Sequence, residues 1–226
     1  MLTVKYLNLG GIMYAVLSLN DEKYQPLADL TWNKNKQIYC ERHGYLGINK
    51  TSGFKGNIPI GFEKIAFVLD VLNEHPEVEW LWWTGSDAMI TNHTIRIEDK
   101  IDNNYDLIIA TDCNEINNDS FLLKNSDWSK KYMQQIYDLI PQYKNHYFYE
   151  QQAMIDTYFE NKDHIKLVPQ RYLNAYMNEL YPHQIKYDLL GNDGTWQKGD
   201  WLIHWPGTGL DLRLKLADHF LQQVEV

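Results

Sequence analysis

The sequence predicts an α/β fold with a mostly parallel central sheet flanked by helices. Three observations indicate this fold: short apolar runs that are typical of buried strands, amphipathic segments between them, and the order strand–helix–strand–helix–strand as far as residue 83. The chain has 226 residues, of which 44% are hydrophobic, so it can bury a sizeable core.

The first strand is predicted at 13–19 (MYAVLSL), where the apolar run is continuous, as in strands buried on both faces. Residues 22–43 predict a helix around Pro26, and Gly44 is its stop signal. A second short strand follows at 45–49.

The next unit begins with a loop at 51–61, which is rich in Gly, Asn and Pro. Residues 61–75 place apolar side chains at helical spacing and predict an amphipathic helix. Residues 77–83 then form a third strand. The later elements are less regular: strands at 107–111, 120–125, 166–169 and 200–205, and helices at 128–140, 150–161 and 210–223.

Bulk properties exclude some classes of function. The net charge of −9 argues against non-specific nucleic-acid binding, since the largest basic run is only Lys34-Asn35-Lys36. No stretch of 18 apolar residues is present, so no transmembrane helix is expected.

The amino-terminal 20 residues are apolar, but Lys5, Asn8 and a Gly-Gly pair interrupt them, and we expect no signal peptide. Cys40 and Cys113 have no metal-ligand spacing and need not pair. These features together predict a cytoplasmic protein in a reducing compartment.

The stretch 80–92 (WLWWTGSDAMITN) ends a predicted buried strand on a single carboxylate, Asp87. Ligands of open α/β sheets bind beyond the carboxyl ends of the strands, so Asp87 is well placed to hold a divalent cation that carries a diphosphate. The alternative is that Asp87 caps a helix beginning at AMITN.

Several blocks of the sequence resemble, in order, glycosyltransferase family 34, the family of fungal galactosyl- and mannosyltransferases and plant xylosyltransferases. EWLWWTGSDAMITN (79–92) is similar to the family's EWIWWLDADALIMN, and INNDSFLLKNSDWS (116–129) is similar to "lNaGsFliRNs-x-Ws". Further blocks resemble the family's patterns too: NKNKQIYCERHGYLGIN (33–49), GFEKIAFVLDVLNEHPEVEW (61–80), EQQAMI (150–155), QRYLNAY (170–176) and GDWLIHWPG (199–207). Capsid glycosyltransferase domains of large DNA viruses look similar as well.

The resemblance implies a single GT-A glycosyltransferase domain over 1–226 with a Rossmann-like sheet. In such a domain 1–92 would be the nucleotide-binding half and 93–226 the acceptor and catalytic half. It implies metal ligands Asp87 and His204 for Mn²⁺ or Mg²⁺. The alternative for His204 is a hydrogen-bonded core histidine between apolar neighbours. One departure stands out: Gly85 replaces the first acid of the family's Asp-x-Asp motif.

The resemblance also implies a donor site, formed by Ser18 and Asn20 at the end of the first strand, Lys64, Ser86 with Asp87, and Gly207. Asn20 could instead cap the following helix, and Lys64 could lie on a solvated helix face. The family's phosphate-binding Lys after Gly207 has no counterpart here, and Lys198 and Arg213 are weak substitutes.

Glu150, Gln151 and Asn117 match family positions near the reacting sugar, and this makes them the catalytic candidates. Glu150 could instead complement the dipole of a helix N-terminus, and Asn117 could belong to an Asn-Asn-Asp turn. Asp112 could bind sugar hydroxyls. Four tryptophans near the predicted site, Trp82, Trp83, Trp201 and Trp205, are expected to divide between the core and a sugar-facing wall.

The function that the resemblance implies is metal-dependent transfer of a hexose or pentose from a nucleoside diphosphate sugar, UDP-sugar being favoured, to a glycan or other hydroxyl acceptor with retention of configuration. The main alternative is a catalytically degenerate nucleotide- or sugar-binding domain, suggested by Gly85. A nucleotidyltransferase would need a Gly-rich basic loop after the first strand, and SLNDEKYQP (18–26) is not one. A plain sugar-binding module would need neither nucleotide nor metal.

Overall fold

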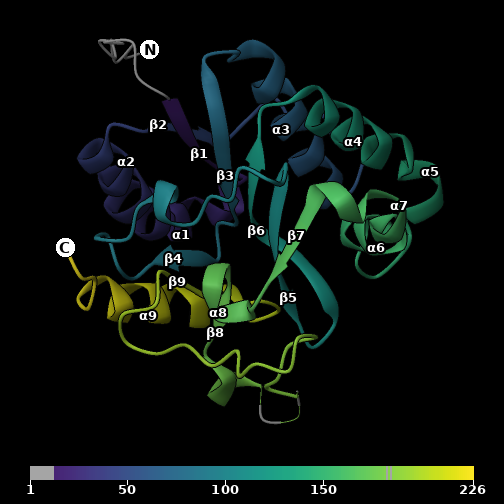
Figure 1. The fold of residues 1–226 in the computed structure, drawn as a ribbon. Helices are drawn as coiled ribbons and strands as arrows, with labels where there is room; N and C mark the ends of the chain where they lie inside the picture. Colours follow the sequence, from purple (N-terminus) through teal and green to yellow (C-terminus); the bar gives the residue numbers. More distant parts are fainter. Residues whose placement is uncertain (1–12, 182, 184) are drawn as a thin grey trace.

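The computed structural model describes residues 13–181, 183 and 185–226 (Figure 1). Residues 1–12, which carry most of the segment considered for a signal peptide, lie outside the described residues. The described strands form a six-stranded sheet of order β2-β1-β3-β6-β5-β7 and a three-stranded sheet of order β4-β9-β8. Their bounds are β1 Met13–Leu19, β2 Leu46–Lys50, β3 Val78–Thr84, β4 Ala88–Ile90, β5 Leu107–Asp112, β6 Glu115–Lys124, β7 Ile165–Val168, β8 Ala175–Tyr176 and β9 Leu202–His204.

The main sheet is parallel except at β6, which confirms the predicted mostly parallel α/β class. β1 pairs in parallel with β2 and β3, and β5 pairs in parallel with β7, whereas β6 is antiparallel to both of its neighbours. Both faces of the sheet are covered. In β3, Leu81 and Trp83 pack into one core while Trp80 and Trp82 pack into the other, which explains the continuous apolar run.

Helices lie on both faces of the main sheet (Figure 1). Residues of α3, α4 and α6 pack against one face, and residues of α2 and of the π-helix before it pack against the other. The α-helices are α1 Gln25–Ala28, α2 Gln37–His43, α3 Ile60–Glu74, α4 Asp127–Asp138, α5 Ile140–Tyr143, α6 Glu150–Asp156, α7 Tyr158–Asn161, α8 Gln170–Leu173 and α9 Leu210–Leu221. The π-helix is η2 Asp29–Lys36, and the 3₁₀ turns are η1 Glu22–Tyr24, η3 Ile97–Asp99, η4 Lys162–His164 and η5 Asn178–Leu180.

The small sheet forms a third core with α1 and α9, built around Met89, Ile203, Trp205 and Phe220. β4 and β9 are antiparallel, and Ala88 lies opposite His204. This pairing brings the segment after β3 next to the end of β9. Among the described helices, none has both the length and the apolar character that crossing a membrane requires.

Three predicted helices are interrupted. The segment 22–43 consists of η1, α1, η2 and α2, with Pro26 in the first turn of α1, and it ends at Gly44 with φ 72° as predicted. The helix predicted at 128–140 ends at Asp138, and Pro141 lies in the first turn of a separate short helix that begins at Ile140. The helix predicted at 150–161 divides at Thr157, whose hydroxyl donates to the Ala153 carbonyl at 2.7 Å.

The alternative that Asp87 caps a helix is wrong. Residues Ala88–Ile90 form β4, which pairs with β9. The strand predicted at 200–205 is shorter than expected, Leu202–His204, and belongs to the small sheet. Both errors have one cause, since a three-residue strand carries too few side chains to show a period in the sequence.

The turn alternative for Asn117 is also wrong, because β6 begins at Glu115 and includes this segment. Ile109 pairs with Phe121, and the next residue of β5, Ala110, pairs with Asn117. Residues 118–120 are therefore extra residues in β6 relative to β5, and they form a bulge. Bulges re-aim side chains at sheet edges and near active sites.

Candidate active site

A cleft of about 1120 Å³ opens where β1 and β3 end. It also reaches the bulge of β6, the start of α6 and the loop after β9. Nine of the ten predicted site residues line it: Asn20, Lys64, Ser86, Asp87, Asn117, Glu150, Gln151, His204 and Gly207. The tenth, Ser18, is buried inside β1. The position of the cleft agrees with the rule that ligands bind at the carboxyl edge of α/β sheets.

Two carboxylates and one imidazole meet in this cleft: Asp87 from the β3–β4 turn, Asp119 from the β6 bulge and His204 from the end of β9. Nε2 of His204 lies 3.5 Å from Oδ1 of Asp87 and 3.1 Å from Oδ2 of Asp119. One ligand atom from each residue lies within 4.8 Å of the others. The sequence indicated Asp87 and His204 but missed Asp119.

The donor set fits a divalent cation. Carboxylate oxygens and an imidazole nitrogen are ligands that Mn²⁺ accepts, and Mg²⁺ favours the oxygens. His204 Nδ1 lies 2.9 Å from Oδ1 of Asn174, an acceptor that holds the proton on Nδ1 and leaves Nε2 free to coordinate. Oδ2 of Asp119 is shielded from solvent and accepts no hydrogen bond from any residue that the structure describes. A cation would satisfy that oxygen.

The two acids differ in their electrostatics. Burial and then the neighbouring charge of Asp87 raise the pKa of Asp119 to about 6, although His204 opposes the shift. Burial also acts to raise the pKa of Asp87, but His204 and Arg213 outweigh it and hold that pKa well below its usual range. The two acids act against burial to raise the pKa of His204.

Arg213, in the first turn of α9, is the cation in closest contact with this cluster. Its Nη2 lies 2.6 Å from Oδ2 of Asp87, and its Nε faces the Trp205 carbonyl and the Thr208 hydroxyl at 3.3 Å. Arg213 is buried and lines the cleft beside Gly207. Lys198, the other basic residue considered from the sequence, lies outside the cleft lining.

A buried ion pair forms another wall of the cleft. Nζ of Lys64 lies 2.7 Å from Oε1 of Glu150, and Lys64 also donates to the carbonyl and side-chain oxygens of Asn118 at 3.1 and 2.9 Å. Lys64 is 5% exposed, so the alternative that it lies on a solvated helix face is wrong. Gly61 is needed here because a Cβ at this position would lie 1.6 Å from Oε2 of Glu150.

A third polar group lies around Asn117. Its Nδ2 donates to Oδ2 of Asp112 at 2.9 Å and lies 2.7 Å from the Tyr176 hydroxyl, which itself donates to the same Asp112 oxygen at 2.7 Å. Gln151 reaches the same segment, since its Oε1 accepts from the Asn118 backbone N–H at 3.4 Å. Hydrogen bonds thus connect the bulge segment to Asp112 and Tyr176 through Asn117, and to Gln151 through the Asn118 backbone.

At the end of β1, Asn20 does not cap the following turn. Asp21 does, by accepting from the Tyr24 N–H at 3.0 Å, and Asn20 Oδ1 instead accepts from Asn49 at 2.7 Å. All four tryptophans are buried in the cores, and of them Trp83 also borders the cleft. The expected sugar-facing wall is therefore reduced to Trp83.

Lys36 supports the backbone of the β3–β4 turn, a role that was not predicted from the sequence. Its Nζ is buried and donates to the carbonyls of Gly85 and Ala88, both at 2.7 Å. Burial lowers the pKa of Lys36 to about 7, although the negative charges of Asp119 and Asp87 act to raise it. Thr31 adds a hydrogen bond to the Ser86 carbonyl at 2.8 Å, so η2 fixes the backbone that carries Asp87.

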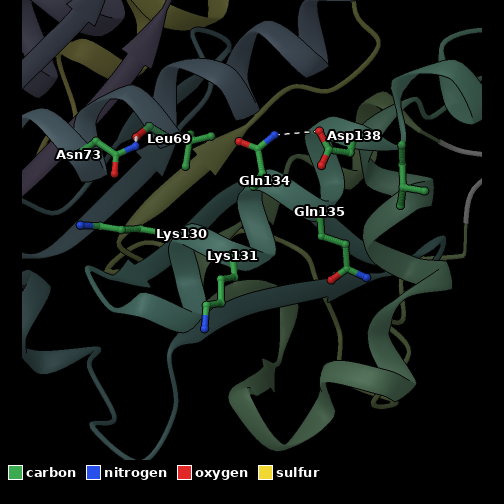
Figure 2. A pocket seen from close by; sticks show the side chains of 8 residues that line it. Leu69, Asn73, Lys130, Lys131, Gln134, Gln135 and Asp138 are labelled. Carbon is green, nitrogen blue, oxygen red and sulfur yellow. Dashed lines mark hydrogen bonds between the residues drawn. The ribbon is translucent and has the colours of Figure 1, made fainter.

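A second hollow lies on α3 and α4, away from this cleft (Figure 2). Its lining consists mainly of Lys and Gln side chains of α4, and Gln134 donates to Asp138 at 2.8 Å. The metal-ligating and buried ionisable groups described above all line the first cleft or lie directly behind it. The first cleft is therefore the candidate active site.

Residues 15–104 and 100–209 match the model of the galactosyl transferase GMA12/MNN10 family. A Schizosaccharomyces pombe protein named an uncharacterized alpha-1,2-galactosyltransferase is 28% identical over 222 residues, which cover 77% of this chain and 54% of that protein. A Saccharomyces cerevisiae protein named a probable alpha-1,6-mannosyltransferase is 24% identical over 182 residues, covering 63% of this chain and 46% of that one. The chain thus spans about half the length of these relatives.

The fold is that of a solved glycosyltransferase involved in the glycosylation of the major capsid of PBCV-1. The two superpose with a TM-score of 0.76 at 18% identity, over 92% of this chain and 99% of the other. These matches confirm the expected family resemblance and the GT-A fold.

Proposed function

Because the chain belongs to the galactosyl transferase GMA12/MNN10 family, we propose that it is a metal-dependent glycosyltransferase. The donor is a nucleoside diphosphate sugar, with UDP favoured, and the acceptor is a hydroxyl of a glycan or related molecule. The observation that carries this proposal is the convergence of Asp87, Asp119 and His204 in a cleft at the carboxyl edge of the sheet.

In this proposal residues 1–92 bind the nucleotide and 93–226 supply the acceptor side and the catalytic groups. Asp87 and His204 hold Mn²⁺ or Mg²⁺. When bound, the ion supplies positive charge that offsets the charge developing on the leaving diphosphate. Arg213 lies beside Asp87 and adds a guanidinium, which suits phosphate oxygens because its N–H donors match their geometry.

The nucleoside lies at the end of β1 near Asn20, with Ser86 and Gly207 along the diphosphate. Ser18 is left out of this site because it is buried in the strand. Asn117 and Gln151 orient sugar hydroxyls. The Glu150 carboxylate is held by Lys64, so it acts as a fixed negative charge near the sugar, where an oxocarbenium-like centre develops. We expect retention of the anomeric configuration, as in the family.

The test is release of nucleoside diphosphate from UDP-galactose, UDP-xylose and GDP-mannose with Mn²⁺. We expect release with one donor, and its loss in His204→Ala. The matched control is Asp138→Asn, an exposed acid in the second hollow. A folded protein that binds nucleotide but turns over no donor would favour the degenerate binding domain. A folded protein that neither binds nor releases nucleotide would contradict the proposal.

A further inference from the structure

We infer that Asp119 replaces the acid missing at position 85, so that one metal-binding carboxylate has moved from the end of β3 to the neighbouring strand β6. This inference rests on the proposed function and concerns how this chain completes its cation site. Positions 85 and 119 are then alternative attachment points for a single carboxylate.

The two positions face each other across an antiparallel strand pair. The β3–β6 register ends with Thr84 opposite Ser120, and Gly85 and Asp119 are the residues directly beyond this pair. The Gly85 N–H donates to the Asp119 carbonyl at 3.0 Å. Side chains of directly opposed residues have Cβ atoms only about 4.5–5.5 Å apart, so carboxylates from either position can reach the same space.

The structure shows that Asp119 already fills the space of a side chain at 85. A Cβ built on Gly85 would lie 2.1 Å from Oδ2, 2.5 Å from Oδ1 and 2.6 Å from Cγ of Asp119. The backbone at Asp119 has little freedom to retreat, since its N–H donates to Oδ1 of Asn117 at 3.0 Å and its carbonyl accepts from Gly85. A side chain at 85 and the present Asp119 conformation therefore exclude each other.

The sequence pattern contains the same exchange. The family pattern EWIWWLDADALIMN has an acid where this chain has Gly85, and the pattern "lNaGsF" has a glycine where this chain has Asp119. By itself, the glycine at position 85 suggests that the cation site has lost a ligand. Because the two positions are in contact, we read both departures as one compensated change.

The Asp119 carboxylate is also positioned to act as a ligand. Its Oδ2 is shielded from solvent, lies 3.1 Å from Nε2 of His204 and accepts no hydrogen bond within the part of the chain that the structure describes. Such an oxygen is costly to leave unsatisfied unless a cation binds it. Asp119 thus completes a three-ligand set that Asp87 and His204 alone leave open.

The test compares Asp119→Asn, Asp119→Gly, Gly85→Asp and the double variant Gly85→Asp/Asp119→Gly. Mn²⁺ binding is measured by electron paramagnetic resonance without nucleotide, and UDP binding with Mn²⁺ by calorimetry. We expect each single variant to bind Mn²⁺ at least tenfold more weakly than the wild type. The Mn²⁺ affinity of the double variant should recover to within a few-fold of the wild-type affinity. The control Asp138→Asn should bind Mn²⁺ as tightly as the wild type does.

Asp119→Asn keeps the volume of the side chain, so it decides the question even if the double variant does not fold. Wild-type Mn²⁺ affinity in Asp119→Asn, or a folded double variant no better than Asp119→Gly, would overturn the inference. If Asp87→Asn abolishes Mn²⁺-dependent UDP binding while Asp119→Asn does not, the proposed function stands, but the inference that Asp119 replaces the acid missing at position 85 is wrong. If the wild type binds Mn²⁺ through Asp119 but no nucleotide, the proposed function fails and the relocation stands.

Discussion

The guanidinium of Arg213 lies 2.6 Å from the Asp87 carboxylate, so a protein cation contacts the acid that is expected to bind a metal ion. Arg213 contacts Oδ2 of Asp87, whereas Oδ1 faces Nε2 of His204 at 3.5 Å. This arrangement directs Oδ1 toward the second expected metal ligand and places a guanidinium next to it.

Replacing Arg213 should separate diphosphate binding from metal binding. We expect Arg213→Met to weaken UDP binding in Mn²⁺ by at least tenfold, because a charge-assisted contact to phosphate is lost, while uridine binding stays unchanged. Calorimetry with UDP and uridine measures both. Mn²⁺ affinity without nucleotide should not fall, since Asp87 loses a competing cation. Equal losses for UDP and uridine would show that Arg213 does not contact the diphosphate.

Replacing one partner of the Lys64–Glu150 pair should destabilise the protein strongly. Both side chains are buried, so Lys64→Met leaves the Glu150 carboxylate without its cation and should lower the free energy of unfolding by about 3–5 kcal/mol. The double variant Lys64→Met/Glu150→Gln should be less destabilised than the single one. Urea unfolding gives these values.

The half-buried pair Lys166–Asp102, which is more open to solvent and has the same 2.7 Å separation, provides the control. Lys166→Met should cost less than about 1 kcal/mol, because solvent screens the pair. If Lys64→Met and Lys166→Met lower the free energy of unfolding by similar amounts, then burial does not make the Lys64–Glu150 pair more costly to break.

Lys36 should make stability depend on pH. Its folded-state pKa of about 7 is below the ordinary value of 10.5, so between these values the unfolded chain binds more protons than the folded one. Stability should therefore rise with pH over this window, by up to about 1.4 kcal/mol per pH unit. The unfolding free energy of the wild type minus that of Lys36→Met should increase by about 2 kcal/mol from pH 7 to pH 9. A constant difference would mean that Lys36 stays charged when buried.

The sequence predicted the main sheet well because its strands are long enough to show a pattern. β1 and β3 are seven-residue strands composed mostly of apolar residues, and α3 has clear helical spacing. The strands of the small sheet have two or three residues and carry no periodicity, so β4 and β8 were missed. The helix predicted at 128–140 stops directly before Pro141, and the structure ends α4 two residues earlier, at Asp138.

The site was predicted only as far as single motifs allow. Asp87 follows β3, a strand that the sequence makes visible, and His204 was indicated by the resemblance of residues 199–207 to a family pattern. Asp119 was missed because its position depends on the β3–β6 register and on the bulge, and neither can be read locally. The clue is three polar residues, Asn117 to Asp119, at the start of an apolar strand, but the sequence alone also allowed a turn at this place. Lys36 was missed for a similar reason, since its partners are 49 and 52 residues away.

The proposed metal-dependent donor site is tested most directly by calorimetric titration of the protein with UDP and then GDP, with and without Mn²⁺, in the wild type and in Asp87→Ala. We expect one nucleotide, with UDP favoured, to bind only when Mn²⁺ is present, and we expect Asp87→Ala to abolish this binding. A folded wild-type protein that binds neither nucleotide, or that binds one equally well without metal and without Asp87, would contradict the proposed site.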